Sequence, residues 1–186
     1  MKNQRKKNLY TLCECGIFLA LAIALSYLEI AIGVAGGSIS FTMLPLLFIA
    51  YRHGGFWGIG SGFVFGILKP IISPSVFWGL PSMILDYVIA YAVIGIAGFI
   101  MKNRKLTEVG ALIGCATRYV IHTISGVLLF AITEPTTIEG LGTYSNPIIY
   151  SLVYNATYML PSSLGCIILI ASLRPVLKRM DKSLNG

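Results

Sequence analysis

The stretch from Leu9 to Val34, LYTLCECGIFLALAIALSYLEIAIGV, decides the fold class of this chain. It is apolar apart from Glu14, Glu29 and a few uncharged polar residues, and it exceeds the roughly 20 residues that carry an α-helix across a bilayer. A basic N-terminal segment before an apolar run is also typical of a secretion signal, but this run is too long for one. We therefore predict that it forms a transmembrane helix.

The composition extends this prediction to the whole chain. The 186 residues are 56% hydrophobic and 11% charged, and a mean hydropathy of +0.81 is too apolar for a soluble domain. The length permits about six crossings and leaves no room for an extramembrane domain, so energy coupling must come from another polypeptide. We expect one all-α integral membrane domain over residues 1–186, with basic cytoplasmic tails at 1–8 and 174–186.

Six apolar runs are candidates for these crossings. The second run is short for a full crossing and contains Pro45, so a tilted, kinked or partly re-entrant course stays open for it. The predicted spans are 9–32, 38–51, 55–72, 76–101, 106–133 and 147–173.

The positions of lysine and arginine test these spans independently, because cytoplasmic ends are enriched in both. With six spans and a cytoplasmic N-terminus, twelve of the fourteen basic residues fall at inner ends, whereas the outer connections hold only Lys69. Without the short second span, the basic cluster at 102–105 would lie on the opposite side from the N-terminus. We therefore predict six transmembrane helices with both termini in the cytoplasm. The net charge of +7 then reflects orientation and not nucleic-acid binding.

Three polar side chains fall at one depth of the predicted bundle. Counted from the outer ends of their spans, Asp86, His122 and Asn155 lie roughly 12 to 16 Å below the outer surface at about 1.5 Å per residue. An ionisable group inside a bilayer costs several kcal/mol unless it is paired or solvated, which makes each one a functional candidate. The ionisable residues within the spans are Glu14, Glu29, Asp86, Arg118 and His122.

Aromatic residues crowd the same layer. A carboxylate, an imidazole, an amide and several aromatic faces suit a flat, nitrogen-rich, cationic ligand, which gains from charge pairing, cation–π contact and stacking. Acidic residues in the longest outer connection, Glu134 and Glu139, would favour the approach of a cation. The aromatic residues are Phe65, Phe77, Trp78, Tyr87, Tyr91, Phe130, Tyr150, Tyr154 and Tyr158.

Structural readings stay open beside this one. Asp86 and Arg118 could neutralise each other across two helices, and the three tyrosines of the last span could be packing residues or interface anchors. Lys69, next to Pro70, is interpreted as a loop residue that snorkels to the surface. The cysteines are interpreted as small buried hydrophobes, and we expect no metal site.

A stripe of small residues runs along the first span. Gly16, Ala20 and Ala24 recur every four residues, which allows another helix to approach closely. Ordinary packing inside the bundle and docking of a partner helix both remain possible.

Four segments of the chain match a known family. They are GSISFTMLP at 37–45, LDY at 85–87 with GIAG at 95–98, RYVIH at 118–122 with Gly126, and YSLVYN at 150–155. Together they resemble the thiamine-specific substrate-binding (S) component of energy-coupling factor (ECF) importers of the bacterial cytoplasmic membrane. In such an importer the S component has no cofactor of its own, and it works with a transmembrane coupling subunit and two ATPase subunits that use ATP.

The resemblance implies a role for individual residues. Asp86, Tyr150 and Asn155 would bind the aminopyrimidine of thiamine, while His122 and Phe130 would flank the thiazolium. Phe65 and Tyr87 would complete the aromatic wall, Gly126 would leave room for a ring, and Ser40 would be a further contact. Gly16, Ala20 and Ala24 would dock onto the coupling subunit. Some family members have Glu in place of Asp86 and Trp in place of Phe65 and Phe130.

The resemblance thus implies high-affinity thiamine binding and ATP-driven uptake. The sequence holds no GxxxxGK[ST] nucleotide motif and no catalytic set, which agrees with a passive binding partner. One alternative is an S component for another vitamin or a thiamine precursor. Others are a small membrane enzyme that uses Asp86 and His122 as acid and base, and a dimeric channel or carrier that works without ATP.

Overall fold

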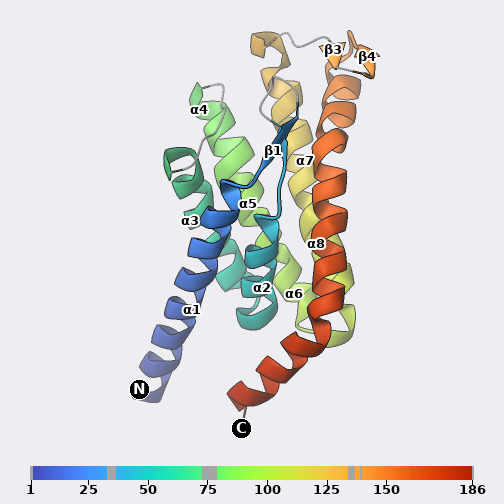
Figure 1. Ribbon diagram of the computed structural model, residues 1–186. Coiled ribbons are helices and arrows are strands. Elements are labelled where there is room, and N and C mark those ends of the chain that lie inside the picture. Colours follow the sequence, from blue (N-terminus) through green and yellow to red (C-terminus); the bar gives the residue numbers. More distant parts are fainter. Residues whose placement is uncertain (1, 33–36, 73–78, 134–136, 139, 186) are drawn as a thin grey trace.

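The computed structural model describes residues 2–32, 37–72, 79–133, 137–138 and 140–185, with their side chains except at 2–4, 130–133 and 180–185. It is an elongated bundle of helices with both chain ends at the same end of the bundle (Figure 1). The long helices are α1 (Lys2–Ser26), α3 (Gly55–Ile72), α7 (Thr107–Thr133) and α8 (Pro147–Asn185).

A further long helical segment runs from Gly79 to Met101 and changes its pitch along the way. It begins as an α-helix, widens into a π-helix and tightens into a 3₁₀ turn before it ends. Its parts are α4 (Gly79–Ser82), η1 (Met83–Ile89), α5 (Ala90–Ala92), η2 (Val93–Ile96) and α6 (Ala97–Met101), and the short 3₁₀ turn η3 (Arg104–Leu106) links it to α7.

Five helices among the described residues are long and apolar enough to cross a membrane. They correspond to the first, third, fourth, fifth and sixth predicted spans, which confirms an all-α membrane fold. The second predicted span contains α2 (Met43–His53), whose 11 residues reach about 16 Å. The count of six crossings, with both termini cytoplasmic, stays a prediction.

Helix α2 lies in the core of the bundle. Its side chains Met43, Leu46, Leu47 and Ile49 are at most 1% exposed, because α1, α3 and the segment from Gly79 to Met101 pack around it. Pro45 falls in its first turn, where the missing N–H has no intrahelical acceptor to lose. The proline therefore starts this helix and does not kink it.

Two short β-hairpins were not expected from the sequence. Strand β1 (Ile30–Ile32) pairs antiparallel with β2 (Gly37–Ile39), and β3 (Thr137–Ile138) pairs with β4 (Gly142–Thr143). The first hairpin shortens two predicted spans, because α1 ends at Ser26 and α2 begins only at Met43. Hydropathy could not reveal this, since a short apolar strand and the end of an apolar helix have the same composition.

Glycines allow α3 to approach the segment from Gly79 to Met101 closely. A Cβ atom at Gly58, Gly62 or Gly66 would come within 3.0 Å of backbone atoms of that segment. Small residues at such spacing are typical of helix contacts in membranes. This close packing sets the position of η1, which carries one of the candidate site residues.

Ion pairs cluster at the end of the bundle where the chain termini lie. Glu14 of α1 pairs with Arg52 and, at 2.9 Å, with His53 at the end of α2. Arg174 of α8 donates to Glu108 of α7 at 2.8 Å. Basic residues that the sequence assigned to inner turns thus also connect the helices at this end.

Candidate functional site

An acidic group and an imidazole from different helices form the centre of the site. Nδ1 of His122 on α7 lies 3.2 Å from Oδ1 of Asp86, and their side chains are only 10% and 21% exposed. The hydroxyl of Ser82 donates to Oδ2 of the same carboxylate at 2.8 Å. Asp86 lies within the π-helical turn η1, and such turns often occur at functional sites because they redirect side chains. The predicted convergence of these two residues is thus seen as a direct contact.

The amide of Asn155 is connected to this pair through Tyr158. The Tyr158 hydroxyl donates to Oδ1 of Asn155, and Nδ2 of Asn155 donates to the carbonyl oxygen of Ser151 at 2.8 Å. The ring of Tyr158 meets that of His122 edge to face at 6.2 Å. Asn155 is therefore held in one orientation by residues of its own helix, and Tyr158 forms a wall against the imidazole.

The three tyrosines of α8 form a continuous row. The rings of Tyr150 and Tyr154 stack at 5.7 Å with only 5° between their planes, and Tyr158 follows at the same centroid distance. The Tyr154 hydroxyl accepts from the N–H of Gly37 at 2.9 Å and donates to the carbonyl of Ile32 at 3.3 Å. The row therefore has two roles, because Tyr158 contacts His122 and Tyr154 holds the β1–β2 hairpin.

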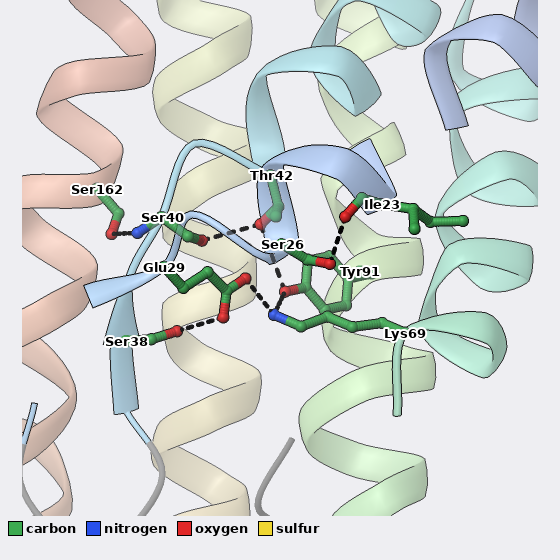
Figure 2. A network of polar contacts seen from close by, with 9 residues as sticks. All are labelled: Ile23, Ser26, Glu29, Ser38, Ser40, Thr42, Lys69, Tyr91 and Ser162. Atoms are coloured by element: carbon green, nitrogen blue, oxygen red, sulfur yellow. Dashed lines mark hydrogen bonds and ion pairs between the residues drawn. The ribbon is translucent and has the colours of Figure 1, made fainter. Parts of the chain in front are cut away.

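A second polar network includes a buried lysine (Figure 2). Nζ of Lys69 donates to Glu29 and, at 3.1 Å, to the hydroxyl of Tyr91. Glu29 also accepts from the hydroxyl of Ser38 on β2 at 2.8 Å. The interpretation of Lys69 as a snorkelling loop residue was wrong, because this side chain lies within α3 and is 4% exposed.

Arg118 contacts the second network through Tyr91. Its guanidinium lies over the ring of Tyr91 at 4.2 Å, and it is one helical turn from His122 on the same face of α7. Among the described residues it forms no ion pair with Asp86, so the alternative in which these two neutralise each other is not seen. The carboxylates of Glu29 and Asp86 balance Lys69 and Arg118 in number, which limits the cost of burying these four charges.

Three other predicted ligand contacts, Phe65, Tyr87 and Ser40, are buried in the bundle. Phe65 is fully buried and meets Tyr91 edge to face at 4.6 Å, and Tyr87 is buried next to Asp86 in sequence. The hydroxyl of Ser40 hydrogen-bonds with that of Thr42 at 2.9 Å, and the N–H of Ser40 donates to the hydroxyl of Ser162 at 3.1 Å. Phe65 and Ser40 thus both contact residues other than Asp86 and His122.

Gly126 and Phe130 complete the predicted set on α7. A Cβ atom at Gly126 would collide with the hydroxyl of Ser151, so this glycine brings α7 and α8 into close contact. The side chain of Phe130 lies outside the described residues. So do Phe77, Trp78, Glu134 and Glu139, which the sequence had also placed around the site.

The small-residue stripe on α1 faces away from the bundle. Gly16, Ala20 and Ala24 are all exposed, and a Cβ atom at Gly16 would meet nothing within 4 Å. The opposite side of the helix is the buried one and includes Cys15 and Ala22. Packing inside this chain therefore does not account for the stripe.

Sequence reasoning missed three contributors to the site. Lys69 was conspicuous as the only basic residue assigned to an outer connection, and that anomaly was the signal for a buried charge. Ser82 and Ser151 gave no signal, because an isolated serine in a membrane helix is common. The described residues contain no group of three or more His, Cys, Asp or Glu that could hold a metal ion.

Comparison with known proteins gives consistent matches over nearly the whole chain. Residues 12–182 match the model of a family described as thiamine transporter protein. The chain is 35% identical to the thiamine transporter ThiT of Bacillus subtilis, with 96% of this chain and 97% of that protein covered. It is 28% identical to ThiT of Lacticaseibacillus paracasei, with 98% and 96% covered. A solved structure of ThiT from Listeria monocytogenes superposes with a TM-score of 0.77 and 29% identity, and covers 92% of this chain and 98% of that one.

Proposed function

The chain belongs to the thiamine transporter protein family, and we propose that it captures thiamine outside the cell and takes part in its uptake. Membership of this family makes it a multi-pass membrane transport protein and not an enzyme. The contact between Asp86 and His122 is then part of a binding site and not an acid–base pair for catalysis.

The observation that carries this proposal is the Asp86–His122 contact beside a row of tyrosines. Thiamine joins an aminopyrimidine to a positively charged thiazolium. A buried carboxylate can accept hydrogen bonds from the amino group, and aromatic faces can stabilise a flat cation. The arrangement of charges and rings therefore matches both halves of this ligand.

We assign the individual contacts as the family resemblance implies. Asp86, Tyr150 and Asn155 bind the aminopyrimidine, His122 and Phe130 flank the thiazolium, and Tyr87 contributes to the wall. Phe65, Ser40 and Gly126 support the site indirectly, because each contacts neighbouring helices or loops. Oδ1 of Asn155 already accepts from the Tyr158 hydroxyl. To bind the ligand through this oxygen, Asn155 must either give up that hydrogen bond or accept a second one.

The partners belong to the same proposal. The protein acts as the S component of an ECF importer, which includes a transmembrane coupling subunit and two ATPase subunits that hydrolyse ATP. The outward-facing stripe of Gly16, Ala20 and Ala24 supports this role, because small exposed residues let a partner helix approach closely.

Titration with thiamine tests the function directly. The chain has two tryptophans, and we expect saturable quenching of their fluorescence by thiamine. In a separate equilibrium assay with labelled thiamine, excess unlabelled thiamine should compete for the site. Mass spectrometry of the purified protein should also detect thiamine that copurifies. No saturation at micromolar thiamine, with saturation by another vitamin or by a thiamine precursor, would instead favour an S component of different specificity.

Reconstitution tests the partners. We expect uptake into vesicles only when the coupling subunit and ATPases are present with ATP. Uptake by the protein alone would contradict this proposal and favour a carrier that works without ATP, while leaving thiamine binding itself unaffected.

A further inference from the structure

The ring of His122 is held in a defined orientation. Its Nδ1 faces Oδ1 of Asp86 at 3.2 Å, and Ser82 fixes the same carboxylate from the other side at 2.8 Å. Tyr158 meets the imidazole at an interplanar angle of 88°. These contacts from two other helical segments leave the ring little freedom to flip.

The opposite nitrogen of this ring has no partner. Nε2 of His122 is buried and makes no hydrogen bond within the part of the chain that the structure describes. A buried polar atom without a partner is destabilising, so such an atom at a binding site is a place where a ligand would gain from a contact.

The surroundings decide whether Nε2 carries a proton. A carboxylate only accepts hydrogen bonds, so Nδ1 must carry the hydrogen that points to Asp86. A second proton on Nε2 would make an imidazolium, one turn from the guanidinium of Arg118 and with no acceptor for the new N–H among the described residues. The neutral form with a free lone pair on Nε2 is therefore favoured.

We infer that His122 is a neutral imidazole protonated on Nδ1, and that its Nε2 accepts a hydrogen bond from a donor group of the ligand. The inference rests on the proposed function for the identity of that ligand. Thiamine offers donors of three kinds: an amino group, a hydroxyl group and the polarised C–H of the thiazolium. An anionic group is excluded from this contact, because an anion only accepts hydrogen bonds and the lone pair on Nε2 has no hydrogen to donate.

Nitrogen NMR tests the protonation state directly, since the chain has only two histidines. In ¹⁵N-histidine-labelled protein carrying His53→Asn, the remaining signals belong to His122. We expect a pyrrole-like shift for Nδ1 and a pyridine-like shift for Nε2 without ligand. A pyrrole-like Nε2, or two protonated nitrogens near neutral pH, would overturn the inference whatever the ligand is.

Addition of thiamine to the same sample tests the contact. We expect the Nε2 resonance to move upfield, as it does when a ring nitrogen accepts a hydrogen bond, while Nδ1 changes little. Saturable binding with an unmoved Nε2 would overturn the contact and leave the proposed function intact. An absence of thiamine binding would instead contradict the proposed function, and the ligand-free spectrum would still decide the protonation state.

Paired substitutions give a second readout. The amide of His122→Gln reaches the position of Nε2, whereas that of His122→Asn reaches the position of Nδ1. We expect His122→Gln to bind thiamine about tenfold more tightly than His122→Asn, the equivalent of one hydrogen bond. Equal affinities, or tighter binding by His122→Asn, would contradict an acceptor role for Nε2.

Discussion

Lys69 of α3 and Glu29, which follows α1, form an ion pair whose side chains are only 5% and 12% exposed. It connects the β1–β2 hairpin to the helix bundle, because Glu29 also accepts from Ser38 on β2. Two opposite charges in this position stabilise each other, whereas loss of Lys69 would leave the buried Glu29 carboxylate without this partner.

Lys69→Met should therefore lower the free energy of unfolding by about 3 kcal/mol. Thermal unfolding in detergent, followed by circular dichroism, measures this loss. The double variant Glu29→Gln/Lys69→Met should be less destabilised than Lys69→Met, because it leaves no unpaired charge. Lys102→Met, at an exposed lysine, is the control, and equal melting of the two lysine variants would contradict a structural ion pair.

Asp86→Asn should weaken thiamine binding by about 2 kcal/mol, or roughly thirtyfold, because it removes the charged acceptor. Ser82→Ala should cost less, about 1 kcal/mol, since it removes only the hydroxyl that orients this carboxylate. Isothermal titration calorimetry measures both. Ser172→Ala changes an exposed serine on α8 and should bind normally, and wild-type affinity in Asp86→Asn would be incompatible with the proposed site.

Gly16→Trp should abolish ATP-driven uptake but leave thiamine affinity unchanged. The indole would project from the exposed face of α1, where nothing in this chain lies within 4 Å of the new Cβ, and would block a partner helix. Uptake into vesicles with the complete importer, measured beside calorimetric binding, separates the two effects. The matched control is Ile17→Trp, at a neighbouring residue that is 69% exposed; loss of uptake in both variants, or in neither, would rule out a specific docking stripe.

Gly62→Ala should destabilise the protein by about 1 to 3 kcal/mol, because its Cβ would collide with the carbonyl group of Tyr91 in the neighbouring segment. Gly60→Ala on the same helix meets nothing within 4 Å and should be neutral or stabilising by up to about 1 kcal/mol. The melting temperatures of the two variants separate the effects: Gly62→Ala reports the close contact, and Gly60→Ala reports helix propensity alone. A lower melting temperature for Gly60→Ala than for Gly62→Ala would contradict the close contact.

The sequence was sufficient to predict most of the fold and the convergence of two residues of the candidate site. Each of the long spans was recognised from hydropathy, because transfer of an apolar helix into lipid is a property of its own residues. Asp86 and His122 were recognised because ionisable groups are rare inside membranes. Helical rise then placed them at one depth, and the structure brings them into contact at 3.2 Å.

The sequence could not show what surrounds each residue within that fold. Lys69 was assigned to a loop and is buried against Glu29, and Gly126 lies directly against the hydroxyl of Ser151. Hydropathy measures whether a segment leaves water, but it does not distinguish lipid from protein as the new surroundings. The run that begins at Leu9 thus determined by itself that this is a membrane protein. Only the tertiary structure decided that it ends as a strand at Ile30–Ile32, because that strand depends on pairing with Gly37–Ile39 and on the hydroxyl of Tyr154, which is distant in sequence.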